Sequence, residues 1–127
     1  MLWLAGWWWI GVSIIHALGG IIIYFAQWQE IAQAGWFNAV APDPLAPIFP
    51  REDAFWFMFL TPFLFILGKL CLWLNHQELV FPISISIILI CTMIIGIFLM
   101  PVSGIWLALP SIILMLYSSK IAQSQDK

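Results

Sequence analysis

Four long apolar stretches constrain the fold of this chain more than any other feature of its sequence. They cover residues 2–25, 54–75, 81–100 and 105–119. Each approaches the roughly 20 residues that an α-helix needs to cross a hydrocarbon core of about 30 Å, although the fourth is somewhat short. Because lipid offers no hydrogen-bond partner to a backbone amide, each stretch is predicted to be a helix. The expected fold class is an all-α membrane protein, a single antiparallel bundle of four transmembrane helices.

Charged residues are too scarce for a water-soluble surface. They make up 8% of the chain, against 64% hydrophobic residues, whereas an average soluble domain carries about a quarter. Four Lys and Arg residues cannot supply a phosphate-binding stripe, so nucleic acid is excluded as a partner. The two cysteines, Cys71 and Cys91, lie inside apolar stretches at different depths, which predicts two free thiols rather than a disulfide.

The connections between the four apolar stretches differ in length. Residues 26–53 form the one long outer loop, and the prolines in its second half exclude a continuous helix there. Its first half, residues 27–36, is predicted to be a short helix at the membrane interface. A polar turn at residues 75–78 and a tight hairpin at residues 101–104 join the remaining stretches. Pro62 and Pro110 fall inside predicted spans and are expected to kink them.

The placement of Lys and Arg predicts an orientation in the membrane. Four crossings put both termini on the same side as the turn after residue 75. Lys69, Lys120 and Lys127 lie toward that side, against Arg51 on the other. Since Lys and Arg are enriched in cytoplasmic segments, both termini are expected to be cytoplasmic and the long loop to face outward.

Small residues recur along one side of three predicted helices, mostly at a spacing of seven. Small side chains let helix backbones approach closely, and this spacing keeps a seam facing its neighbour. Packing within the chain is the expected use, with a homodimer as the alternative. The predicted packing residues are Gly6, Ser13 and Gly20 on the first helix, Ala54, Thr61 and Gly68 on the second, and Gly104, Ala108 and Ser111 on the fourth. The residues expected to meet lipid on the first helix are Leu4, Trp7, Ile14, Leu18 and Ile22.

His16 is the one ionisable side chain well inside the first stretch, and intramembrane ionisable groups are functional candidates. Its place beside the small-residue seam directs it toward the bundle. It could bond to another helix, bind a ligand headgroup or relay a proton. No Cys or carboxylate has ligand spacing with it, so no metal site is predicted, and any cofactor is unknown. The candidate ligand-binding residues are His16, Ser13, Trp9, Glu30, Trp56 and Thr61.

Carboxylates are confined to the loops and the C-terminal tail. None of the four stretches contains Asp or Glu, which argues against a small proton-coupled exporter. Within the long loop, two interpretations remain open. The acids could be solvated and favour the start of the following helix, or one could fold toward His16. These residues are Glu30, Asp43, Glu52 and Asp53. The nine tryptophans gather near predicted boundaries, and an aromatic belt at the interface explains most of them.

Several short motifs occur together along the chain. They are Gly11 and His16 in the tryptophan-rich first stretch, Trp28, Gly35 and Phe37 after it, the Ala-Phe-Trp-Phe run at residues 54–57 with Gly68 behind it, and the Pro-Val-Ser-Gly-Ile-Trp-Leu run at residues 101–107. As a set they resemble a family of small bacterial four-span membrane proteins of unknown function. The resemblance implies a bacterial inner-membrane location and no activity. With the orientation predicted from Lys and Arg, the loop at residues 26–53 is then expected in the periplasm.

The functional expectation is a non-enzymatic membrane protein that binds a lipophilic small molecule or serves as an accessory subunit of a membrane complex. One alternative is a membrane oxidoreductase or lipid-modifying enzyme that uses His16 with an outer-loop carboxylate. Another is a small transporter or channel. The partners expected are the lipid bilayer and a lipophilic ligand, a second copy of the chain or a larger membrane complex.

Overall fold

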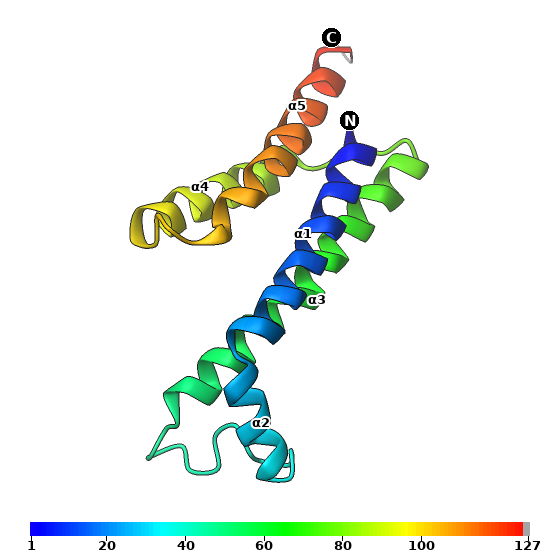
Figure 1. The fold of residues 1–127 in the computed structure, drawn as a ribbon. Helices are drawn as coiled ribbons and strands as arrows, with labels where there is room; N and C mark the ends of the chain where they lie inside the picture. Colours follow the sequence, from blue (N-terminus) through cyan, green and yellow to red (C-terminus); the bar gives the residue numbers. More distant parts are fainter. Residues whose placement is uncertain (126–127) are drawn as a thin grey trace. The chain divides into compact units, whose positions relative to one another are not determined.

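All the regular secondary structure among the described residues is helical. The computed structural model describes residues 1–125, with side chains through Ile121, and within that range no strand occurs. Lys127, which contributed to the predicted orientation, lies outside the described residues. In chain order the elements are α1 (Leu2–Ile23), α2 (Phe25–Gln33), α3 (Phe49–His76), α4 (Ile83–Leu99), the 3-10 helix η1 (Gly104–Ala108) and α5 (Leu109–Gln125) (Figure 1).

Three segments are long and apolar enough to cross a membrane. They are Leu2–Ile23, Phe49–His76 and Gly104–Ile121, whereas α4 has 17 residues and is shorter. Large apolar side chains remain exposed on these helices, and Phe98 on α4 exposes 83% of its surface. Every α1 residue predicted to face lipid is also exposed. Such a surface is costly in water and matches an acyl-chain solvent.

Prolines account for the main differences between the predicted and observed helix ends. α3 begins at Phe49, ahead of the predicted start at Ala54, because Pro50 sits in its first turn. A first-turn residue has no helical partner for its N–H, so proline is tolerated there. Pro110 is likewise the second residue of α5, directly after the 3-10 helix η1. It lies at a helix start, although the apolar segment Gly104–Ile121 that could cross a membrane runs through it.

The first span also ends earlier than predicted. α1 stops at Ile23, and Tyr24 leaves the helical conformation with φ −104° and ψ 24°. The nine-residue helix α2 follows at once. A short helix was predicted for residues 27–36, and the structure has it at Phe25–Gln33, so it begins two residues earlier and ends three residues earlier.

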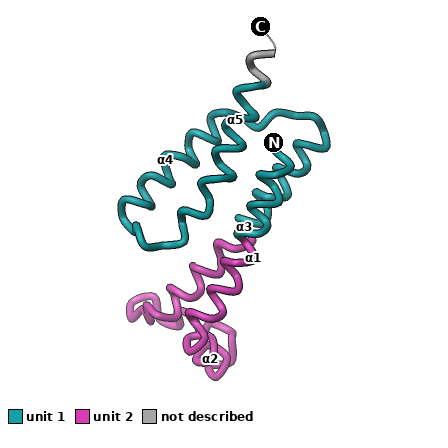
Figure 2. Tube along the Cα trace, turned by 45° about the horizontal axis from the view of Figure 1, so that its top comes forward, with its two compact units in different colours: residues 1–12, 64–127 teal, residues 13–63 magenta. Residues whose placement is uncertain are grey.

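The chain forms two compact units (Figure 2). Unit 1 comprises Met1–Val12 and Leu64–Lys127, and unit 2 comprises Ser13–Phe63. The long helices α1 and α3 contribute residues to both. Unit 1 therefore contains the first part of α1, the last part of α3, and all of α4, η1 and α5, while unit 2 contains α2 and the proline-rich loop.

In unit 1, α4 and α5 form the predicted hairpin. The turn between them is closed by side chains that bond to nearby carbonyls. The Ser103 hydroxyl donates to Met100 O at 2.7 Å, and the Trp106 indole donates to Pro101 O at 2.8 Å. At the other end, the buried hydroxyl of Ser119 reaches the carbonyl oxygens of both Phe81 and Met115. These bonds satisfy backbone groups that lipid could not.

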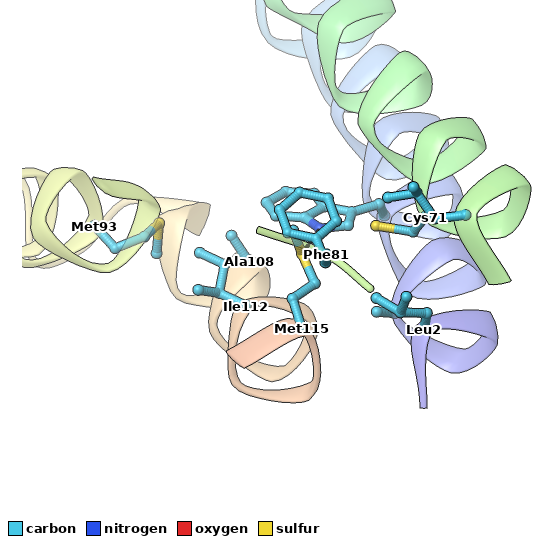
Figure 3. Packing of buried hydrophobic residues seen from close by; sticks show 10 residues of the cluster. Leu2, Cys71, Phe81, Met93, Ala108, Ile112 and Met115 are labelled. Atoms are coloured by element: carbon cyan, nitrogen blue, oxygen red, sulfur yellow. Dashed lines mark hydrogen bonds between the residues drawn. The ribbon is translucent and has the colours of Figure 1, made fainter. Parts of the chain in front are cut away.

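The core of unit 1 lies where α5 meets α1 and α3. Figure 3 shows Phe81 and Met115 together, with Leu2 and Cys71 on one side and Ala108 and Ile112 on the other. Polar bonds also tie α5 to α1, since the buried Ser111 hydroxyl donates to Ala5 O at 2.9 Å. Cys71 is buried and Cys91 is exposed, and both thiols are free.

Glycines bring α1 and α3 into backbone contact within unit 1. A Cβ atom built on Gly68 would lie 2.8 Å from the carbonyl oxygen of Gly6 and 3.0 Å from the amide nitrogen of Ile10. A Cβ atom on Gly6 would lie 2.9 Å from Gly68 O. Only residues without a side chain permit this approach, as is typical of helix pairs in lipid.

Candidate functional site

The loop that follows α2 is the most unusual backbone in unit 2. Gly35 adopts φ +86°, and the amides of Gly35 and Trp36 donate to Ala32 O and Ile31 O. This is the bonding pattern with which a glycine ends a helix. Trp36 and Asn38 then adopt φ +66° and +53°. A left-handed conformation costs a non-glycine residue about 1–2 kcal/mol, so the surrounding contacts must hold these residues in place.

Arg51 supplies one of those contacts. Its Nη1 atom donates to Ala39 O at 3.0 Å, and its Nε atom donates to the Glu30 carboxylate at 3.2 Å. The guanidinium therefore joins the first turn of α3 to α2 and to the loop. Ile31 and Ala39 are buried beside this connection, with 1% and 4% of their surfaces exposed. The fork of donors on arginine suits a carboxylate and a carbonyl at once.

The loop and the start of α3 line an open pocket of about 390 Å³. Three of its eight lining residues are aromatic, and Glu52 is the acidic residue among them. Within the residues that the structure describes, the Glu52 carboxylate has neither an ion pair nor a hydrogen bond. The lining residues are Trp36, Asn38, Ala39, Val40 and Ala41 from the loop, and Glu52, Phe55 and Trp56 from α3. A concave site lined by aromatic and small apolar residues with a few polar ones, here Glu52 and Asn38, is typical of small-molecule sites.

His16 also lies in unit 2, where it contacts Phe57 and does not line the pocket. Its Nε2 atom lies 2.8 Å from the carbonyl oxygen of Phe57, and its ring stacks on the Phe57 ring with centroids 3.9 Å apart and planes 11° apart. Because a carbonyl only accepts, Nε2 must carry the hydrogen, which leaves Nδ1 as the acceptor in the neutral ring. His16 thus links α1 to α3, which is the hydrogen-bonding interpretation of its sequence position.

The structure separates the predicted ligand-binding residues. Trp56 lines the pocket, and Glu30 helps to build it through Arg51. Glu30 is bonded to Arg51 and His16 to Phe57, so neither contact joins the predicted carboxylate–histidine pair. Ser13 is buried in α1, and the hydroxyl of Thr61 is buried without a hydrogen-bond partner among the described residues.

Trp9 belongs to the core of unit 1 instead. It exposes 3% of its surface, and its indole nitrogen donates to Met115 Sδ at 3.3 Å. Trp9 does not line the pocket. It also does not lie at an exposed helix boundary, which is the position that the sequence predicted for most tryptophans.

Apart from Ser13 and Thr61, the predicted packing residues fall into three groups. Gly6 and Gly68 meet across α1 and α3, and Ala108 and Ser111 are buried on η1 and α5 in the same unit. Gly20 and Ala54 are buried in unit 2, where Gly20 lies against the side chains of Phe57 and Met58. Gly104 is exposed at the start of η1, and a Cβ atom there would meet only Leu107 Cδ1, at 3.9 Å.

Trp36, Glu52 and Phe55 are pocket residues that sequence reasoning did not propose as ligand-binding. A usable signal was present, since Gly35 directly before an aromatic pair marks a helix end followed by a constrained turn. The pairing of that turn with the start of α3 depends on Arg51 and is not visible in the spacing.

Among the described residues, no group of three or more His, Cys, Asp or Glu side chains could hold a metal ion. The fold defines an all-helical protein with three helices long and apolar enough for a membrane. The chain belongs to the family of unknown function DUF6463, whose pattern matches residues 2–122. No curated protein and no solved structure matches the chain.

Proposed function

We propose that this chain is a non-enzymatic membrane protein that binds a lipophilic small molecule in the pocket between the loop after α2 and the start of α3. The observation that carries the proposal is the aromatic wall with the unpartnered Glu52 carboxylate. Trp36 supports it, since a bulky residue in a left-handed conformation is a cost that a binding site would justify. In this proposal His16 serves helix packing, since Nε2 donates to the Phe57 carbonyl and its ring stacks on the Phe57 ring.

The proposal includes a membrane arrangement of four crossings, with α4 as the shortest. Its 17 residues span about 25 Å at roughly 1.5 Å per residue, and a slightly thinned bilayer accommodates that length. The family resemblance favours a bacterial inner membrane. The excess of Lys over Arg51 on the terminal side favours cytoplasmic termini and a periplasmic pocket.

Such a position would put the pocket in the interfacial region, where tryptophan is most favourable. A ligand with an acyl chain could leave that chain among the exposed apolar side chains and insert its polar end. Trp36 and Trp56 expose 62% and 61% of their surfaces, so they are available for contact with such a molecule.

Binding is tested with three probes that share a dodecyl chain, namely dodecyltrimethylammonium, dodecanol and dodecyl sulfate. The protein is held in lipid nanodiscs, and bound probe is counted by native mass spectrometry. We expect saturable binding of at least one probe, at about one molecule per chain, and a loss of about three- to tenfold in affinity in Trp56→Ala, because the aromatic wall is removed.

Trp73→Ala is the matched control. Trp73 lies on the same helix, is similarly exposed at 55%, and does not line the pocket. Its removal should leave probe affinity unchanged. If no probe binds saturably, or if both tryptophan variants lose affinity equally, the pocket is not a binding site.

A further inference from the structure

We infer that the pocket selects a ligand with a cationic ammonium headgroup, a primary amine or a quaternary ammonium on an apolar chain. This inference rests on the proposed function and specifies the chemical class that the pocket recognises. Three features of unit 2 support it: the state of its carboxylate, the nature of its wall and the charge of the surrounding segment.

The carboxylate of Glu52 is free to receive a cation. Glu52 lines the pocket and is partly buried, and within the described part of the chain its carboxylate has no counter-ion. The nearest basic residue in sequence, Arg51, is committed to Glu30 and to Ala39 O. Arg51 is not among the residues that line the pocket. An ion pair formed at a partly desolvated carboxylate is stronger than one at an exposed site.

The wall around this carboxylate also favours positive charge. Trp36, Phe55 and Trp56 all line the pocket. The Phe55 and Trp56 rings meet edge to face, with centroids 5.1 Å apart and planes 75° apart. The faces of indole and phenyl rings attract ammonium groups, and indole does so most strongly. An anion would meet both the ring quadrupoles and the Glu52 charge unfavourably, and a neutral headgroup would gain from neither.

The segment that surrounds the pocket adds a longer-range negative potential, which also attracts cations. Residues 26–53 carry four carboxylates and one guanidinium, a net charge of −3. Asp43 is occupied locally, since its Oδ1 atom accepts the amide hydrogen of Leu45 at 2.9 Å. A charged segment of one sign concentrates counter-ions at its surface and speeds their arrival. Cationic amphiphiles are therefore drawn to the pocket before they contact it.

The experiment compares Glu52→Gln with Asp53→Asn using the same three dodecyl probes in the same nanodiscs. Both variants remove one negative charge with little change of shape, but Asp53 is exposed and does not line the pocket. We expect the parent to bind dodecyltrimethylammonium about tenfold more tightly than dodecanol, and Glu52→Gln to lose most of that preference, about five- to tenfold. Asp53→Asn should keep it.

The outcomes separate the two proposals. Equal affinity for all three probes in the parent protein, or an equal loss in both charge variants, overturns the ammonium preference and leaves the pocket as a binding site. Preference for dodecyl sulfate overturns it as well. Absence of saturable binding by every probe overturns the proposed function itself.

Discussion

Replacing Trp9 with alanine is expected to lower the free energy of unfolding of this protein by about 3 kcal/mol, because deletion of a buried aromatic side chain leaves a cavity that the surroundings only partly fill. Trp9 is 3% exposed and packs in the unit 1 core with Leu2, Cys71 and Met115. Its loss also removes the hydrogen bond from Nε1 to Met115 Sδ. In lipid, packing is the main force between helices, so such a cavity is not offset by solvent.

Trp7 offers a matched control on the same helix. It exposes 53% of its surface on the side of α1 predicted to face lipid, so Trp7→Ala should change stability by less than about 1 kcal/mol. Equilibrium unfolding in mixed micelles with increasing dodecyl sulfate, followed by circular dichroism, measures both variants. Equal destabilisation by the two substitutions would contradict the assignment of Trp9 to the core.

Alanine at Gly68 is expected to cost about 2 kcal/mol of stability, because its Cβ atom would strike the backbone of α1. The clash is with Gly6 O at 2.8 Å and Ile10 N at 3.0 Å, neither of which can move without separating the helices. Gly6→Ala should behave similarly, since its Cβ atom would lie 2.9 Å from Gly68 O. Because the two glycines share one contact, the double variant should cost less than the sum of the single ones.

Gly11→Ala tests whether the effect belongs to the contact or to glycine in general. A Cβ atom at Gly11 would find no neighbour within 4 Å. Alanine is favoured over glycine in a helix interior by about 1 kcal/mol, so Gly11→Ala should be neutral or stabilising by up to that amount. The same micelle titration measures all four proteins. A loss of stability at Gly11 equal to that at Gly68 would show that the close approach of α1 and α3 is not responsible.

Much of the helical pattern could be predicted from apolar length alone. The backbone has no hydrogen-bonding alternative in lipid, so the stretch that begins at Leu2 became α1 and the one that contains Gly68 became α3. Helix ends were harder to predict. Proline stops a helix in its interior but is compatible with the first turn, and sequence alone does not show which of these positions Pro50 and Pro110 occupy.

Most of the candidate site could not be predicted from the sequence, because it depends on tertiary contacts. Trp9 was predicted to be a ligand-binding residue, and its burial in the unit 1 core depends on Met115, which is 106 positions away in sequence. His16 was expected to face another helix, but the Phe57 carbonyl as its partner follows from the register of α1 against α3 in unit 2. The pocket depends on positive φ angles at Trp36 and Asn38 and on the bonds of Arg51, none of which has a spacing signature.

The contact between His16 and Phe57 fixes the rotation of α1 about its own axis within unit 2. One pair of residues makes both the hydrogen bond from Nε2 to the Phe57 carbonyl and the stacking of the two rings. Turning α1 by one residue position, about 100°, would break both contacts at once.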